Sequence, residues 1–280
     1  MIETVAIAGV GLIGGSFGLA LRAAGFRGRL LGVSSPATIT AARARGAIDE
    51  GVTLAEAAAR ADVIYLAQPI AQILETIETL GALARPGLLV TDAGSTKRAI
   101  AAKAKQCLSG AVFLGGHPMA GKEARGVEAA EAELFRGRPY LLVPPESEAA
   151  LVDETARWIE AIGAQPRWVS AQEHDRLVAA ASHGPQLLST ALAAALGGRV
   201  DAAAVAGAAG PGLRDMTRLA LSSYEIWRDI LATNGDEIAD ALVEIERAIA
   251  EIRGEIGGPG LAERFAKGAD FSRLLRDRRG

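Results

Sequence analysis

Residues 4–14 read TVAIAGVGLIG, and this stretch decides the fold of the chain. Its first five residues, Thr4–Ala8, are apolar and rich in β-branched side chains, which predicts a short buried strand. The glycine pattern G-x-G-x-x-G follows, and residues 15–22 continue with a helical pattern. A strand, a glycine turn and a helix in this order are typical of a dinucleotide-binding fold.

Each glycine of this turn has a predicted task. Gly9 permits the tight turn, Gly11 lets the backbone approach a pyrophosphate, and Gly14 lets the helix pack closely on the strand. The N–H groups at the start of the helix, where Leu12 and Ile13 lie, present a partial positive charge to the phosphates. We therefore predict that these five residues bind a dinucleotide cofactor. The alternative is a glycine turn with a purely structural role.

The end of the next predicted strand, Arg29–Val33, indicates which dinucleotide binds. About twenty residues past the fingerprint, an Asp or Glu would bond the ribose 2′-hydroxyl of NAD. This chain has Ser34 and Ser35 there, and two hydroxyls can donate to a 2′-phosphate that a carboxylate would repel. Arg43 and Arg45 follow one or two helix turns later. The pattern favours NADP over NAD, and the alternative is that Ser34 simply caps the next helix.

Composition narrows the class of protein. The chain has 280 residues, half of them apolar, so it can build one large domain or two modest ones. Its formal net charge of −3 and the lack of a Lys/Arg run give no basis for nucleic-acid binding. The single cysteine, Cys107, cannot form an intramolecular disulfide, and the apolar segment 187–196 is too short to span a bilayer. We expect a cytoplasmic protein with no metal site and no membrane or nucleic-acid partner.

Strand and helix patterns alternate up to about residue 170. Strands are predicted at 61–67, 88–92, 112–114, 140–143 and 167–169, and helices at 70–84, 95–108 and 148–162. This alternation predicts an α/β Rossmann-type domain over residues 1–170, with a mainly parallel, doubly wound sheet. Residues 171–280 show only helical patterns and are rich in alanine. We predict an all-α domain there that binds substrate and completes its core against a second copy, in a homodimer.

Ligands of doubly wound sheets bind beyond the carboxyl ends of the strands, and three motifs fall at such positions. The glycine fingerprint is the first. The second is DAGSTK at 92–97, and the third is GGHPMAG at 115–121, which places His117 in a glycine-flanked turn just past a strand. We expect all three to rim one cleft. The helical part adds EHD at 173–175, SHGPQ at 182–186 and GPGLRDMTR at 210–218.

These motifs, in this order, resemble the prephenate/arogenate dehydrogenase family of tyrosine biosynthesis over essentially the whole chain. The resemblance implies a Rossmann-type domain, a helical dimerisation domain, and oxidative decarboxylation of a cyclohexadienol to a phenol. It also implies that His117 takes or polarises the proton of the ring hydroxyl, with Ser95 as a second partner of that hydroxyl. Arg218 matches the residue that binds the ring carboxylate, for which its fork geometry is suited. His183 is expected to line the substrate side.

Each of these residues also has a structural interpretation. His117 could be a structural turn histidine, Ser95 could cap the following helix, and His183 could be a packed helix residue. His174 and Asp175 are expected to cap their helix and fix the contact between domains rather than touch substrate.

The sequence allows two interpretations of Lys97. It approaches a phosphate or a carboxylate, or it is a solvated lysine in the first turn of its helix.

One departure from the family pattern concerns the substrate. Many relatives that use prephenate read S-H-x-P-H, and this chain has Gln186 in place of the second histidine. By the resemblance, that position faces the pyruvyl side chain of prephenate or the alanyl side chain of arogenate. Glutamine donates and accepts hydrogen bonds but carries no charge. Together with the missing cofactor carboxylate, Gln186 makes arogenate with NADP a candidate beside prephenate.

Two other classes of function compete with this one. Another two-domain NAD(P)-dependent dehydrogenase, such as a 3-hydroxyacid dehydrogenase or an imine reductase, would place a catalytic lysine or a different polar set on the helical domain. A non-catalytic nucleotide-sensing module would bind the cofactor without turnover, and a change of His117 would cost it nothing.

Overall fold

The computed structural model describes residues 1–146 and 149–277, and the chain divides into two compact units. The first unit consists of Met1–Val178 and Ser222–Asn234. The second consists of Ala179–Leu221 and the chain from Gly235 onward.

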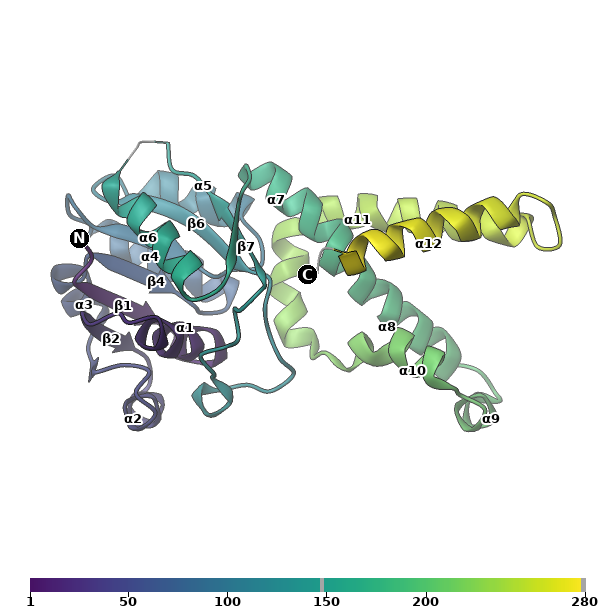
Figure 1. Ribbon diagram of the computed structural model, residues 1–280, viewed down its shortest axis with the longest axis horizontal. Coiled ribbons are helices and arrows are strands. Elements are labelled where there is room, and N and C mark those ends of the chain that lie inside the picture. Colours follow the sequence, from purple (N-terminus) through teal and green to yellow (C-terminus); the bar gives the residue numbers. More distant parts are fainter. Residues whose placement is uncertain (147–148, 278–280) are drawn as a thin grey trace. The chain divides into compact units, whose positions relative to one another are not determined.

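The first unit is built on one sheet with the strand order β3-β2-β1-β4-β5-β6-β7-β8 (Figure 1). Strands β1 to β6 run parallel to one another, whereas β7 is antiparallel to β6 and parallel to β8. The order of the first six strands is that of a doubly wound dinucleotide-binding sheet, so the predicted α/β Rossmann-type fold is confirmed. The bounds are β1 Thr4–Ala8, β2 Arg29–Val33, β3 Glu50–Gly51, β4 Val63–Leu66, β5 Leu89–Asp92, β6 Val112–Pro118, β7 Pro139–Val143 and β8 Gln165–Trp168.

Helices alternate with these strands along the chain. In α4 the isoleucines Ile70, Ile73 and Ile77 recur at spacings of three and four and are buried, because this spacing puts them on one face of a helix. In Figure 1, α1 and α6 lie in front of the sheet, and the fainter α4 and α5 lie behind it. The bounds are α1 Leu12–Ala23, α2 Pro36–Ala44, α3 Leu54–Arg60, α4 Ile70–Gly81, α5 Arg98–Cys107, α6 Ala150–Ala161 and α7 Ala171–Val178.

The core of the first unit lies on both faces of the central strands. Every residue of β4 and β5 is buried, as in parallel strands that helices cover on both sides. On the α1 face, the ring of Phe17 stacks on Tyr65 with the centroids 4.0 Å apart, and Phe135 meets Phe17 edge-on. This packing makes the sheet a rigid support for the side chains at its carboxyl edge.

Strand β6 is longer than predicted, and the expected turn around His117 is wrong. The strand continues through Pro118 because its second half pairs with β7, with Gly116 opposite Leu142 and His117 opposite Leu141. A side chain at Gly116 would not fit, since an added Cβ would lie 2.5 Å from the carbonyl oxygen of Asp92. The glycines beside His117 therefore permit a close approach of two strands rather than a turn.

The second unit is entirely helical in its described part, as predicted. A π-helical segment, Ala179–His183, leads into α8 Gly184–Gly197, and a 3-10 turn, Arg218–Leu221, follows α10. Helix α11 kinks at Asn234, which has non-helical backbone angles and marks the boundary between the units. The remaining bounds are α9 Ala202–Gly207, α10 Pro211–Thr217, α11 Tyr224–Gly254 and α12 Leu261–Asp277.

The division into compact units differs from the predicted boundary near Ser170. Helix α7 stays with the first unit because it contacts α5 and β7. The first eleven residues of α11 also belong there, since the amide of Asn234 donates to the main-chain oxygen of Asp175 over 2.9 Å. Within residues 1–146 and 149–277, no helix combines the length and apolar character needed to cross a membrane.

Candidate active site

The glycine turn between β1 and α1 leaves one stretch of backbone open. Gly9 has a φ of +88°, and an added Cβ there would lie 2.7 Å from the carbonyl oxygen of Ala67. An added Cβ at Gly14 would lie 2.2 Å from the oxygen of Gly9, so both glycines are required by packing. A Cβ at Gly11 would meet no atom within 4 Å. The side of the turn at Gly11 is therefore open to a ligand.

The N-terminus of α1 suits an anion. Its N-cap, Gly11, supplies no side-chain hydrogen bond, and its first turn holds no acidic residue. The first N–H groups of a helix lack intrahelical partners and carry a partial positive charge, which favours a phosphate. The backbone around Leu12 and Ile13 thus fits the diphosphate of a dinucleotide.

A cleft of about 540 Å³ lies at the carboxyl edge of the sheet. It is lined by Ile13 of α1, residues 67–72 after β4, residues 93–95 after β5, Arg125, and the first turns of α11. Ser95 is half-buried in its wall. Ser95 does not cap α5, because the N-cap of this helix is Lys97, whose side chain makes no capping hydrogen bond. The alternative role expected for Ser95 is therefore wrong, and its hydroxyl remains available to the cleft.

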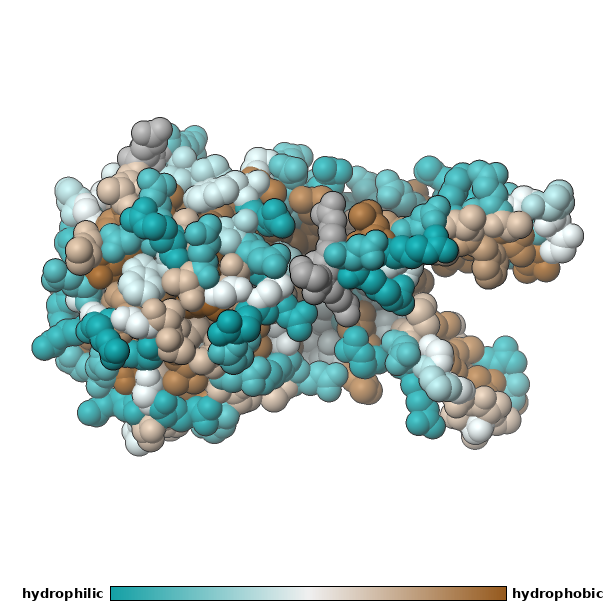
Figure 2. All heavy atoms as spheres, in the orientation of Figure 1, coloured by the Kyte–Doolittle hydropathy of each residue, from teal (hydrophilic) through white to brown (hydrophobic). Residues whose placement is uncertain are grey.

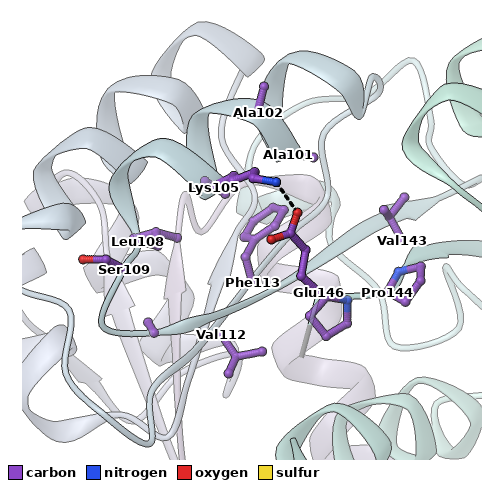
Figure 3. A pocket seen from close by; sticks show the side chains of 13 residues that line it. Ala101, Ala102, Lys105, Leu108, Ser109, Val112, Phe113, Val143, Pro144 and Glu146 are labelled. Atoms are coloured by element: carbon purple, nitrogen blue, oxygen red, sulfur yellow. Dashed lines mark hydrogen bonds and ion pairs between the residues drawn. The ribbon is translucent and has the colours of Figure 1, made fainter. Parts of the chain in front are cut away.

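Another cavity, of about 470 Å³, lies at the opposite end of β6 (Figure 3). Leu108 and Val112 precede or begin β6, and Pro144 follows the antiparallel strand β7, so these residues mark the amino end of the parallel strands. Lys105 and Glu146 form an exposed ion pair across this cavity. None of the predicted site residues lines it.

The two serines after β2 are exposed. The N-cap of α2 is Ser35, whose hydroxyl accepts from the backbone N–H of Thr38 over 3.3 Å, so the expectation that Ser34 caps this helix is wrong. Arg45 donates to the carbonyl oxygen of Ala130 over 2.6 Å, while Arg43 remains exposed. The end of β2 therefore presents hydroxyls and no carboxylate.

A chain of three buried side chains connects β6 to α7. Nδ1 of His117 lies 2.9 Å from Nε2 of His174, and Nδ1 of His174 lies 2.8 Å from a carboxylate oxygen of Asp175. The exposed fraction is 8% for His117 and zero for the other two. Such a chain fixes the orientation of both imidazole rings.

The protonation states of Asp175 and His174 follow from their burial and their hydrogen bonds. Burial would raise the pKa of Asp175, but hydrogen bonds from His174 and from the backbone N–H groups of Arg98 and Lys97 outweigh it and hold this pKa below its usual value. Burial lowers the pKa of His174, and the charge of Lys97 acts in the same direction, against the hydrogen bond to Asp175. Asp175 is therefore ionised and His174 is neutral near pH 7.

The ionised Asp175 and the neutral His174 fix the tautomer of His117, the candidate general base. His174 donates its Nδ1–H to the carboxylate of Asp175, so its Nε2 holds a lone pair and accepts. The proton between the two rings then belongs to Nδ1 of His117. The remaining ring nitrogen of His117, Nε2, carries the lone pair that a general base requires.

Asp175 also closes the N-terminus of α5. Its carboxylate accepts from the backbone N–H of Lys97 at 2.7 Å and of Arg98 at 2.9 Å, and the guanidinium of Arg98 lies 3.3 Å from it. A carboxylate at this position is stabilised by the helix dipole. The expectation that Asp175 caps its own helix is therefore wrong, because it caps a different helix across the fold.

Lys97 is not a solvated lysine, and the carboxylate that it approaches belongs to the protein itself. It is fully buried, and its ammonium pairs with the buried carboxylate of Asp92. Burial lowers the pKa of Lys97 against the opposing charge of Asp92. The other oxygen of Asp92 accepts from the N–H of Gly116 over 3.0 Å, so this ion pair supports the strand residue next to His117.

The other candidate residues lie in the second unit. His183 ends the π-helical segment and is buried, while Arg218 begins the 3-10 turn and is exposed. Gln186 is 5% exposed, and its amide nitrogen donates to the carbonyl oxygen of Leu219 over 2.7 Å. The structure thus ties Gln186 to the turn that carries Arg218.

The contact of His174 with His117 was missed from the sequence. One signal was present, because His174 and Asp175 fall with Val178 on one face of α7, and all three are buried. Two polar residues on the apolar stripe of a helix indicate a buried hydrogen-bond network.

A doubly wound sheet, an open glycine turn and a buried Asp–His–His chain beside the same edge define a nicotinamide-nucleotide-dependent dehydrogenase. The family models for the prephenate dehydrogenase nucleotide-binding domain and dimerization domain match residues 17–167 and 170–268. The chain belongs to the prephenate dehydrogenase family.

Individual relatives agree with this assignment. The prephenate dehydrogenase of Bacillus subtilis is 35% identical over 262 residues, which cover 90% of this chain and 70% of the relative. The crystal structure of Synechocystis arogenate dehydrogenase has a TM-score of 0.83 at 31% identity and covers 98% of this chain and 99% of that one. The structure of A. aeolicus prephenate dehydrogenase with hydroxyphenyl propionate and NAD+ has a TM-score of 0.89 at 29% identity, with 98% of both chains covered.

Proposed function

We propose that this protein catalyses the oxidative decarboxylation of a cyclohexadienol, prephenate or arogenate, with NAD(P)+ as hydride acceptor. The observation that carries the proposal is the buried chain from Asp175 through His174 to His117, which equips His117 with a lone pair on Nε2. Relatives named as prephenate and arogenate dehydrogenases support the substrate class.

The reaction needs a general base for the proton of the C4 hydroxyl and a group that holds the ring carboxylate. The open backbone at Gly11 would hold the dinucleotide, whose nicotinamide would supply a hydride acceptor for C4 of the ring. Nε2 of His117 takes the proton of the C4 hydroxyl as the carbonyl forms, and Ser95 orients that hydroxyl from the wall of the cleft. The bond from C1 to the carboxylate then breaks and carbon dioxide leaves. The electron pair of that bond makes the ring aromatic, and the C4 oxygen takes the proton back from His117 as the phenol forms.

The histidine chain stabilises the charge that this step creates. When His117 takes the proton, its imidazolium donates Nδ1–H to the neutral His174, which is in turn held by the ionised Asp175. The positive charge is thereby compensated without any rearrangement of the site. In the second unit, the exposed guanidinium of Arg218 is the proposed partner of the ring carboxylate, with His183 lining the substrate.

The orientation of Gln186 supports arogenate over prephenate. Its amide nitrogen lies 2.7 Å from the oxygen of Leu219 and 3.3 Å from the hydroxyl oxygen of Thr190, so both N–H groups are engaged. The oxygen Oε1 is left to contact the substrate, and it can only accept. The ammonium group of the alanyl side chain of arogenate donates, whereas the keto group of prephenate does not.

NADP is the proposed cofactor over NAD. The support is the absence of a carboxylate after β2 and the two exposed serines at that point. The hydroxyl of Ser35 already contacts Thr38, which leaves Ser34 as the principal donor for a 2′-phosphate.

A cytoplasmic homodimer built through the second unit is also part of the proposal. The family model that matches residues 170–268 is that of a dimerization domain. Helix α12 has no buried residue, yet it exposes large apolar side chains such as Phe265 and Phe271. Figure 2 shows hydrophobic residues on the surface of the α11 and α12 segments of this unit. Light scattering should give twice the mass of the 28.9 kDa chain.

A steady-state assay tests the activity. Prephenate and arogenate are each offered with NAD+ and with NADP+, and the nicotinamide absorbance is followed. We expect the highest kcat/KM for arogenate with NADP+. A folded protein that binds cofactor but turns over neither substrate would overturn the proposed reaction and favour another dehydrogenase or a nucleotide-sensing role.

A further inference from the structure

Gln68 occupies a special position in the nucleotide cleft. It follows the carboxyl end of β4 and precedes Pro69, the N-cap of α4. It lines the cleft of about 540 Å³ together with Ile13 from the start of α1 and Ser95 after β5. Its stem passes over the fingerprint, since an added Cβ at Gly9 would lie 2.8 Å from Cγ of Gln68.

A buried hydroxyl holds the carboxamide of Gln68 in one orientation. Oγ1 of Thr76, a residue only 9% exposed on α4, lies 2.9 Å from Oε1 of Gln68. This contact is the one hydrogen bond of the Thr76 hydroxyl among the described residues. Because a buried hydroxyl donates when an acceptor is available, the threonine donates and the amide oxygen accepts. The NH2 group of Gln68 is thereby directed elsewhere, and it has no partner within residues 1–146 and 149–277.

Other groups at this turn are already engaged. The backbone N–H of Ala71, in the first turn of α4, donates to the carboxylate of Asp229 over 3.1 Å. That carboxylate in turn contacts the guanidinium of Arg228 at 3.2 Å. The first turn of α4 is therefore already partly satisfied by Asp229. Gln72 of this turn also lines the cleft, but Gln68 is the residue whose amide the buried Thr76 orients.

We propose that Gln68, preset by Thr76, donates a hydrogen bond to the ribose–diphosphate chain of the dinucleotide. The inference rests on the proposed NAD(P) function and adds a binding residue outside the glycine fingerprint. Its chemistry is specific: the two N–H groups of a neutral amide meet the acceptor oxygens of a diphosphate or a ribose. Thr76 is a positioning residue, because it acts on the cofactor only through Gln68.

Equilibrium binding of NADPH and NADH, followed by nicotinamide fluorescence, tests the proposal without turnover. Gln68→Leu removes the donor and should raise Kd about tenfold. Gln68→Glu keeps the shape but places acceptors against acceptors, so it should raise Kd by more than the leucine variant. Thr76→Val keeps the amide and loses only its orientation, and about a threefold rise is expected. Gln165→Glu, the same charge change on the exposed strand β8, is the matched control and should leave Kd unchanged.

Two fragments locate the contact. ADP-ribose keeps the diphosphate and both riboses, whereas 5′-AMP lacks the diphosphate linkage and the second ribose. Competition by ADP-ribose should weaken in the Gln68 variants, while competition by 5′-AMP should not change. An equal loss for both fragments would overturn the assignment of the contact to the second phosphate and the second ribose, because 5′-AMP keeps only the first of each.

The outcomes separate the inference from the function on which it rests. If the wild-type protein binds neither nicotinamide nucleotide, the proposed function fails and the inference fails with it. If the wild-type protein binds and both folded Gln68 variants bind equally well, only the inference is overturned. Circular dichroism and thermal melting of every variant establish that it is folded.

Discussion

Nδ1 of His117 and Nε2 of His174 lie 2.9 Å apart, and this contact joins a sheet strand to a helix that begins fifty or more residues later in the chain. Because the partner of His174 on its other side is the ionised Asp175, the contact determines which nitrogen of His117 carries a proton. The general base of the proposed reaction is therefore defined by two residues that need not touch the substrate.

Replacement of His117 tests the base directly. His117→Asn should lower kcat by about 10²- to 10⁴-fold, because proton transfer acts mainly in the transition state. The Kd for NAD(P)H should stay within about twofold of the wild-type value, since His117 is not among the residues that line the nucleotide cleft. Single-turnover kinetics and fluorescence titration measure the two quantities. Turnover at the wild-type rate would remove His117 from the mechanism.

Asp175→Asn tests the tautomer assigned to His117. The amide can present its NH2 group to His174, which would reverse the donors along the chain and protonate the wrong nitrogen of His117. We expect kcat to fall about 10²-fold or more. The same change weakens the cap of α5 and should lower the free energy of unfolding by about 1–2 kcal/mol. Ser170→Ala, which removes only the side-chain hydrogen bond to the N–H of Glu173 on α7, is the matched control for stability and should leave kcat unchanged.

The pH dependence of stability follows from the same two residues. The pKa values of His174 and Asp175 are both lower in the folded chain than their ordinary values of 6.5 and 3.8. The unfolded chain therefore binds more protons as the pH falls, first on the histidine and then on the carboxylate. The free energy of unfolding should decrease as the pH drops below about 6.5 and decrease further near pH 4. Urea titrations across this range measure it, and His174→Gln should remove part of the upper phase; an unchanged profile in that variant would contradict the assignment.

Two glycines of the fingerprint should respond differently to alanine. Gly14→Ala places a Cβ 2.2 Å from the oxygen of Gly9 and should cost about 1–3 kcal/mol of stability. Gly11→Ala meets no atom within 4 Å, so the melting temperature should stay near that of the wild type. Its methyl group should nevertheless block the approach of a diphosphate and raise the Kd of NAD(P)H at least about tenfold. Unimpaired binding by folded Gly11→Ala protein would mean that the cofactor lies elsewhere.

Gln186 offers a test of substrate preference. If its Oε1 accepts from the ammonium group of arogenate, Thr190→Val should shift the preference toward prephenate, because it releases one N–H of the Gln186 amide. The ratio of kcat/KM for arogenate to that for prephenate should fall about threefold in Thr190→Val and about tenfold in Gln186→Leu. Equal ratios in the wild type and both variants would show that Gln186 only ties α8 to the 3-10 turn.

Local sequence was sufficient for most of the first unit. The β1 strand was predicted with its observed bounds, and so was β2, because burial and β-branched side chains act within a few residues. The geometry of the glycine turn also follows from local requirements, since Gly9 needs its positive φ and Gly14 its close packing. The helical character of the second unit was likewise apparent from composition and periodicity.

Only tertiary structure decided the environment of the site. Strand β6 extends through His117 because β7 pairs with it, and the pattern of residues 112–118 contains no sign of that partner. Lys97 is buried because Asp92 neutralises it, although a lysine in a first helical turn is usually solvated.

The same distinction separates the candidate residues from their roles. The sequence by itself determined that a histidine stands within the third predicted site motif and that glycines leave the backbone after β1 without side chains. It did not determine that Asp175 caps a helix 77 residues away or that His174 meets a histidine 57 residues away. Strand and turn preferences are local free energies, whereas the ionisation and tautomer of His117 depend on contacts that exist only once distant segments are packed together.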